Sequence, residues 1–260
     1  MTETQLKQHP VILTRTGAVN QRLALRFSKL GFRTFAWPAF TIRLPEDETP
    51  VVKRFSDLSD IDLVLLVSPA SVAHWVDHWP SHVTLATVGE GTARVARAAW
   101  GESVPIIYPA GDAAHSGSEA LMAELRKRGI PSRVLICRGQ TGREWLSEEL
   151  LSEGADVQKL MCYERLPLQL TVQQEDELRE AMKGPAPVTY ITSSEAIVSL
   201  LRAVHPVEGA WEWITSGAVV VIHPRSESKV LEAGFHLVRM SSPIDDEVEK
   251  NVIACAEGLG

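Results

Sequence analysis

Short apolar runs alternate with amphipathic stretches along most of the chain. The first run is residues 11–14 (VILT), and Val19, Leu23 and Phe27 then follow four residues apart. This spacing predicts a helix with one buried face, and Gly31 just past its end is typical of a left-handed C-terminal cap. The next strand is expected at residues 32–37. A strand followed by a helix is therefore the repeating unit of this sequence.

The same unit recurs through the middle and the last third of the chain. Further strands are expected at 61–67, 84–88, 104–108, 133–137, 155–163, 188–192, 218–222 and 235–240. Apolar positions with helical spacing follow at 72–79, 92–99, 121–125, 145–150, 197–204, 230–231 and 248–252, and a polar, acidic helix is expected at 171–182. Such alternation is typical of parallel sheets with helices on both faces, so the pattern predicts the α/β class.

The distribution of strands predicts a discontinuous domain. Residues 1–36 supply two strands and one helix, too few to enclose a core, whereas 44–160 carry five expected strands and four helices. The tail, 168–260, is also short of strands for a sheet of similar size. We therefore expect 1–36 and 168–260 to form one domain, with 44–160 inserted into it. Residues 37–43 and 161–167, each with a proline and an aromatic residue, would form a two-stranded hinge.

Composition and charge narrow the class of protein. The chain has 260 residues, 45% hydrophobic and 23% charged, which suits a globular protein of two domains. No apolar run reaches the roughly 18 residues of a membrane span, and the polar start lacks a signal-peptide pattern, so we expect a cytoplasmic protein without a membrane partner. The formal charge is −7 and no block is rich in lysine or arginine, so no nucleic-acid partner is expected. We expect a monomer.

Neither metal nor nucleotide chemistry is indicated. The three cysteines form no CxxC pair, so neither a disulfide framework nor a zinc site is expected. The GEGT turn at 89–92 lacks the third glycine of GxGxxG, and no P-loop lysine motif or GxSxG elbow is found. We therefore expect no metal or redox cofactor and no serine nucleophile.

The strand-to-helix junctions are the candidate binding elements. In a doubly wound sheet, ligands bind beyond the carboxyl ends of the strands, where helix N-termini offer unpaired amides to anions. Each junction alone is consistent with ordinary helix capping, but six of them carry hydroxyls, glycines or arginines, which indicates a polyanionic ligand held between the two domains. The candidate binding residues are Thr14, Arg15, Ser68, Ser71, Gly89, Thr92, Arg138, Gly139, Arg143, Thr192, Ser193, Ser194 and Arg225.

Taken together, the junctions resemble those of a known enzyme family. The matching segments are TR at 14–15, SPASV at 68–72, VGEGTA at 88–93, residues 137–157, CYER at 162–165, TSSEA at 192–196 and residues 223–235. In this order they resemble the uroporphyrinogen-III synthase family over essentially the whole chain. Ala70 and Thr16 depart from the asparagine and proline that many members carry there.

The resemblance implies two flavodoxin-like domains, the second inserted into the first, and a lyase that needs no cofactor. The implied substrate is hydroxymethylbilane, a linear tetrapyrrole with eight carboxylate arms, which loses water and closes with its last pyrrole inverted. A transient encounter with hydroxymethylbilane synthase is a further expectation. Orientation of the two substrate ends, more than acid strength, would then decide the product.

Tyr163 is the candidate proton donor, because it matches the linker tyrosine of the family and a phenol is protonated at neutral pH. Packing of the Tyr163 ring against the hinge, with its hydroxyl at the surface, is an equal alternative. The rival function is a non-catalytic tetrapyrrole- or metabolite-binding module of the same fold. A two-lobed transport binding protein would need a secretion signal.

Overall fold

The computed structural model describes residues 8–72, 78–109, 117–140, 142 and 144–259. The chain divides into two compact units. Unit 1 comprises residues 1–41 and 166–260, and unit 2 comprises residues 42–165. The two divisions fall within the segments that the sequence pattern assigns to the hinge, and hinge motion itself stays a prediction. Within the described residues, no helix has both the length and the apolar character that a membrane span requires.

Unit 1 contains a five-stranded sheet in the order β11-β10-β9-β1-β2. Its strands are β1 (Val11–Leu13), β2 (Thr34–Ala36), β9 (Val188–Ile191), β10 (Ala218–Val221) and β11 (Leu237–Met240). All neighbouring pairs are parallel, with Leu13 opposite both Ala36 and Tyr190. The sheet is fully buried at its centre, which explains why β1 and β10 are continuous apolar runs in the sequence and why β9 is interrupted only by Thr189.

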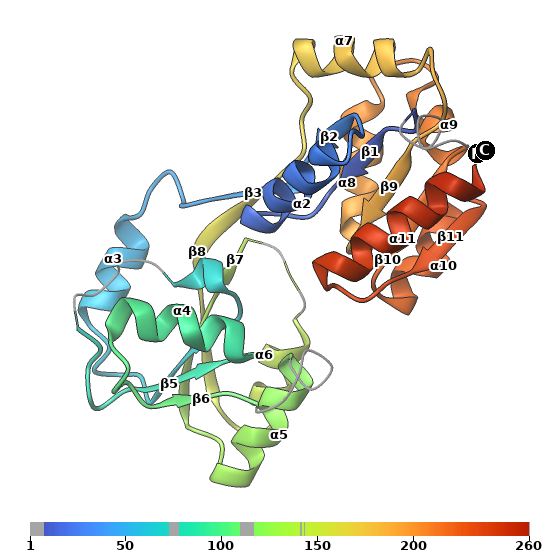
Figure 1. Cartoon of the computed structure of the whole chain (residues 1–260). Helices are drawn as coiled ribbons and strands as arrows, with labels where there is room; N and C mark the ends of the chain where they lie inside the picture. The colour runs from blue at the N-terminus through green and yellow to red at the C-terminus, as the bar shows by residue number, and fades with distance from the viewer. Residues whose placement is uncertain (1–7, 73–77, 110–116, 141, 143, 260) are drawn as a thin grey trace. The chain divides into compact units, whose positions relative to one another are not determined.

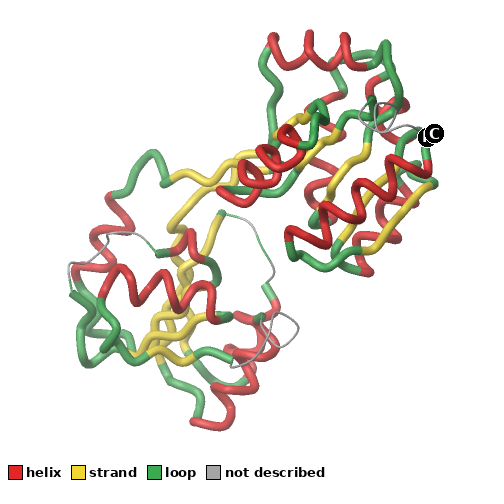
Figure 2. The backbone as a smooth tube through the Cα atoms, in the orientation of Figure 1, coloured by secondary structure: helices red, strands yellow, loops and turns green. Residues whose placement is uncertain are grey.

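Helices cover both faces of this sheet (Figures 1 and 2). They are α2 (Ala18–Lys29), α7 (Val172–Ala181), α8 (Ser194–Val204), α9 (Ala210–Thr215), α10 (Pro224–Glu232) and α11 (Asp245–Gly258). Leu23 and Phe27 of α2 and Val252 of α11 pack on one face, and Leu200 of α8 and Val230 of α10 pack on the other. The helix α2 ends as predicted, with Gly31 at φ 89°.

Unit 2 contains a six-stranded sheet in the order β3-β8-β7-β4-β5-β6. Its strands are β3 (Phe40–Arg43), β4 (Leu63–Leu66), β5 (Thr84–Thr87), β6 (Ile106–Ile107), β7 (Arg133–Gly139) and β8 (Asp156–Pro167). The pairs β8-β7, β7-β4, β4-β5 and β5-β6 are parallel. The helices are α3 (Thr49–Ser56), α4 (Glu90–Trp100), α5 (Ser118–Arg128) and α6 (Trp145–Ser152), with α3 and α4 on one face and α5 and α6 on the other.

The α/β class with mostly parallel sheets is confirmed, and three details differ from the expectations. The sheet of unit 2 does not have the flavodoxin-like strand order, because the chain adds β5 and β6 on one side of β4 before it crosses to β7 on the other. The helices α3 and α9 were not predicted. The helix expected at 72–79 lies mainly outside the described residues, and its described start is a 3₁₀ turn, η1 (Pro69–Ser71), after which Val72 is extended.

Candidate functional site

The six candidate junctions fall at the carboxyl edges of the two sheets. In unit 1, the junctions follow β1, β9 and β10, which are neighbours in one parallel sheet. In unit 2, they follow β4, β5 and β7, which are also neighbours. Parallel neighbours end at the same edge of a sheet, so each unit gathers three of the junctions on one edge.

Hydrogen bonds separate the candidate hydroxyls into two kinds. The Oγ1 of Thr14 donates to the carbonyl of Tyr190 at 2.8 Å, and the Oγ of Ser71 donates to the carbonyl of Cys137 at 3.0 Å. A hydroxyl has one hydrogen to donate, and in these two buried residues it is used within the protein. Thr14 and Ser71 therefore position the backbone at the site and do not present a donor to a ligand in this structure.

Ser68 and Ser193 behave differently, because their oxygens accept. Ser68 Oγ accepts from the amide of Ala70 at 3.1 Å and Ser193 Oγ accepts from the amide of Ala196 at 3.2 Å. Both serines thus cap the helical turn that follows, as the alternative explanation of these junctions expects. Capping uses the acceptor lone pair, so the hydroxyl hydrogen remains available to a ligand.

The other candidates lie at or near the same edges. Thr192 and Ser194 flank Ser193, Gly89 is the residue before α4, and Thr92 is buried within α4. Arg15 is half-buried and donates from Nη1 to the carbonyl of Pro243. The exposed Arg225 lies in the first turn of α10. Arg143 lies outside the described residues.

Three helices at these edges begin directly after a glycine, so no side chain caps them. They are α2 after Gly17, α4 after Gly89 and α5 after Gly117. The first turns of α4 and α5 carry Glu90 and Glu119, whereas the first turn of α2 has no acidic residue. The start of α2 therefore offers both free amides and an uncompensated positive dipole end to an anion.

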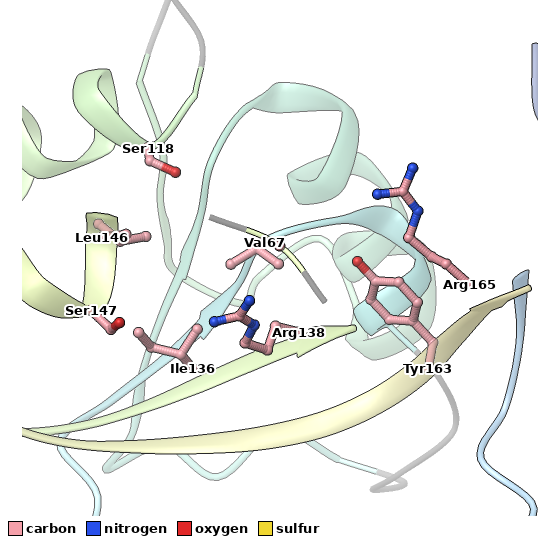
Figure 3. Close-up of a pocket in the computed structure, with 9 residues that line it drawn as sticks. Val67, Ser118, Ile136, Arg138, Leu146, Ser147, Tyr163 and Arg165 are labelled. Atoms are coloured by element: carbon pink, nitrogen blue, oxygen red, sulfur yellow. The ribbon is translucent and has the colours of Figure 1, made fainter. Parts of the chain in front are cut away.

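A pocket of about 210 Å³ opens at the carboxyl edge of the sheet in unit 2. Figure 3 shows Ser118, Leu146 and Ser147 approaching from helices on one side and Tyr163 and Arg165 from β8 on the other. The remaining lining residues are Val67, Ile136, Arg138 and Gly142. The lining combines an apolar floor with two arginines, two serines and a phenol, a donor-rich surface suited to a carboxylate.

An irregularity between β7 and β8 brings Tyr163 into this pocket. Arg138 pairs with Met161, but the next residue, Gly139, pairs with Tyr163, so Cys162 is the extra residue of a bulge. Cys162 and Tyr163 are both buried in the same cluster of the core of unit 2, whereas strict alternation would place consecutive side chains on opposite faces of the sheet. A Cβ at Gly139 would lie 2.6 Å from Cε2 of Tyr163. Gly139 therefore leaves the space that the tyrosine ring occupies.

Arg138 belongs to a charged network beside the pocket. Its Nη1 lies 2.6 Å from Oε1 of Glu144, and the other carboxylate oxygen of Glu144 lies 2.5 Å from Nζ of Lys159. Hydrogen bonds from Lys159 and then from Arg138 lower the pKa of Glu144 to about 2. The carboxylate is thus ionised throughout the neutral range, and with two cations around it the network carries one net positive charge.

Neither Tyr190 nor the buried cysteines adds a second reactive centre. Among the described residues the buried Tyr190 hydroxyl finds no hydrogen-bond partner, and burial raises the pKa of its phenol. Burial also raises the pKa of the Cys137 thiol, which lies beside Cys162. Across the part of the chain that the structure describes, no cluster of three or more histidine, cysteine, aspartate or glutamate side chains could hold a metal ion.

Tyr163, Arg138 and Gly139 were predicted from the sequence as site residues, and the structure brings these three together. Four polar or charged side chains at the site were missed: Ser118, Ser147, Glu144 and Arg165. Arg165 belongs to the CYER segment, and Glu144 directly precedes the apolar positions of α6, so both stood in segments already singled out. No sequence signal separates Ser118 and Ser147 from ordinary first-turn serines.

Comparison with known proteins gives a consistent result. The family model described as uroporphyrinogen-III synthase HemD matches residues 21–247. The uroporphyrinogen-III synthase of Escherichia coli (strain K12) is 24% identical over 248 residues, which is 91% of this chain and 96% of that protein. That of Proteus mirabilis is 28% identical over 163 residues, 60% of this chain and 80% of that protein.

Two solved structures share the fold. A mutant uroporphyrinogen III synthase from the extremely thermophilic bacterium Thermus thermophilus gives a TM-score of 0.63 at 14% identity, and the alignment covers 96% of this chain and 99% of that one. The uroporphyrinogen-III synthetase of Helicobacter pylori 26695 gives 0.60 at 12% identity, with 95% and 99% covered. At these identities the likeness concerns the fold alone.

Proposed function

The chain belongs to the uroporphyrinogen-III synthase family, and from that premise we propose that it is a lyase that converts hydroxymethylbilane into uroporphyrinogen III. In this reaction the terminal hydroxymethyl group leaves as water and the tetrapyrrole closes with its last pyrrole inverted. The observation that carries the proposal beyond family membership is the pocket of unit 2, which is lined by both Tyr163 and Arg138.

The size of the pocket argues for one subsite within a larger binding surface. The volume of the pocket is about 210 Å³. Pockets that enclose a whole drug-sized ligand measure about 300–1,000 Å³, and a tetrapyrrole with eight arms is at least as large. We therefore propose that this pocket receives one carboxylate arm and that other donors hold the remaining arms.

Arg138 and Arg165 are the proposed cationic partners of that arm, and Ser118 is a proposed hydroxyl donor at the same pocket. In unit 1, the uncapped start of α2, Ser193 and Arg225 are proposed to bind further arms. Many moderate contacts suit an octa-anion, because each neutral amide or hydroxyl adds affinity without adding charge to the empty site.

Tyr163 is the proposed proton donor to the departing hydroxyl. Its ring is held by packing against Gly139, and it lines the pocket together with the two arginines. Once the hydroxyl has left as water, an arm fixed at Arg138 would limit the orientations in which the two chain ends meet. Orientation of this kind can contribute several kcal/mol to the preference for one product.

The test is incubation of the purified protein with freshly generated hydroxymethylbilane, followed by oxidation of the products and separation of the isomers. A parallel incubation without protein measures spontaneous closure, which proceeds without inversion. The proposal expects the inverted type III isomer in large excess. An isomer ratio equal to that of the control would leave a binding module as the better explanation. Location, oligomeric state and the encounter with the enzyme that supplies the substrate stay predictions.

A further inference from the structure

Within the part of the chain that the structure describes, the guanidinium of Arg138 is held through Nη1. Arg138 is the penultimate residue of β7, and its side chain is 11% exposed. Nη1 donates to Oε1 of Glu144 at 2.6 Å, and Nη2 lies 3.1 Å from the position that a Cβ on Gly142 would occupy. The guanidinium has five N–H groups in a fixed plane, so an anchor at Nη1 sets the direction of the others.

Glu144 is itself held from a second strand. Its Oε2 accepts from Nζ of Lys159 on β8 at 2.5 Å, while the hydroxyl of Ser147 donates to the backbone carbonyl of Glu144 at 2.7 Å. Both carboxylate oxygens are therefore engaged, although the side chain is 48% exposed. The position of Glu144 relative to the pocket follows from β8 and α6 and does not depend on a ligand.

The charge balance allows an anion to bind next to this network. Arg138 and Lys159 contribute two positive charges and Glu144 one negative charge, so the three side chains carry one net positive charge. Arg138 belongs to this network and lines the pocket, and Ser147, which also lines it, bonds the backbone carbonyl of Glu144. Glu144 itself is not among the described residues that line the pocket.

We propose that Glu144 is a positioning residue for substrate binding: it anchors Nη1 of Arg138, so that the remaining N–H groups of that guanidinium face the pocket and take a carboxylate arm. This inference rests on the proposed function. A positioning role for Glu144 differs from a purely structural one in its consequence. Loss of the Glu144 carboxylate should weaken substrate binding only in a protein that still has Arg138.

The decisive variant is Glu144→Gln, which keeps the shape and removes the charge. We expect the KM for hydroxymethylbilane to rise about tenfold, with kcat within about twofold, because an interaction made equally in the ground and transition states is weakened. Glu144→Asp retains a carboxylate and should recover part of the affinity. The matched control is Glu148→Gln, one turn further along α6 at an exposed position, where KM should not change.

A double-mutant cycle with Arg138→Gln separates positioning from general damage. If Glu144 acts through Arg138, then Glu144→Gln should raise KM no further in the Arg138→Gln background. Thermal unfolding of each variant identifies any that fail to fold, and Glu144→Asp then replaces Glu144→Gln in the cycle. An unchanged KM in Glu144→Gln, or equal effects in both backgrounds, would overturn the inference while wild-type activity stands. Absence of type III product from the wild-type protein would instead overturn the proposed function.

Discussion

Gly139→Ala tests how the Tyr163 ring is held. The added Cβ would lie 2.6 Å from Cε2 and 2.9 Å from Cζ of Tyr163. Carbon atoms in good contact are about 3.5–4.0 Å apart, so the ring has to retreat by about 1 Å. The ring is 6% exposed and packed in the core of unit 2, which leaves it little free volume. Overpacking of this kind typically lowers the free energy of unfolding by about 1–3 kcal/mol.

The same substitution should have the opposite sign once the ring is removed. Gly139 is not among the glycines with positive φ, so alanine fits its backbone. In a Tyr163→Ala background the contact is gone, and Gly139→Ala should then raise the free energy of unfolding by about 0.4–1 kcal/mol, because it restricts the unfolded chain. The coupling between the two positions is the difference between these values.

Urea-induced unfolding of the four proteins of this cycle measures that coupling. Turnover of Gly139→Ala should also fall by about tenfold or more, because a displacement of about 1 Å at a reacting group can reduce rates about a hundredfold. Equal destabilisation by Gly139→Ala in both backgrounds would refute the idea that this glycine exists to accommodate the ring.

Three further predictions concern single side chains. Tyr163→Phe should fold normally but lower the rate of hydroxymethylbilane cyclisation about tenfold or more, because it lacks the proton donor. Unchanged turnover in a fixed-time assay would exclude the phenol from the chemistry. Glu144→Gln should be less stable than the wild type at pH 7, because hydrogen bonds from Lys159 and Arg138 lower the pKa of Glu144 from 4.5 to about 2 in the folded protein. The gap in urea midpoints should shrink as pH falls from about 4.5 through about 2, and a gap as large at pH 2 as at pH 7 would contradict this. Ser199→Ala should lower the free energy of unfolding by about 1 kcal/mol, because the buried Ser199 hydroxyl donates to the carbonyl of Ala39 and accepts from the amide of Leu168. Calorimetry that shows no loss of stability would count against a stabilising role for these two hydrogen bonds.

The elements that the sequence predicted well are those whose pattern is local. Residues 63–66 (LVLL) are apolar without a break because the strand is buried on both faces, and α8 shows its full amphipathic repeat. The helix α3 was missed because only Val51 and Phe55 are buried in its eight residues, which is too few to define a period. The lateral order of strands in unit 2 was also missed, since apolar runs do not encode which strands are neighbours.

The site was predicted only in part because hydroxyl and charge partners are distant in the sequence. Ser71 and Cys137 are 66 residues apart, and Thr14 and Tyr190 are 176 apart. Without those partners, a hydroxyl committed to a backbone carbonyl is indistinguishable from one that faces a ligand. Glu144 likewise gains its role only when β8 brings Lys159 beside it. Tyr163, by contrast, was identified by family resemblance and not by any periodic pattern.

The proposed function requires donors beyond the pocket of unit 2, because one pocket receives one arm, and the free backbone amides at the start of α2 are the proposed donors in unit 1. Titration of the ¹⁵N-labelled protein with uroporphyrinogen III under anaerobic conditions, followed by amide NMR shifts, tests this most directly. The account predicts large shifts for Ala18 and Val19, and none in the first turn of α7, where Thr171 and Gln174 already form a capping box. Shifts in α7 equal to those in α2, or no shift at Ala18 and Val19 in a saturated complex, would contradict it.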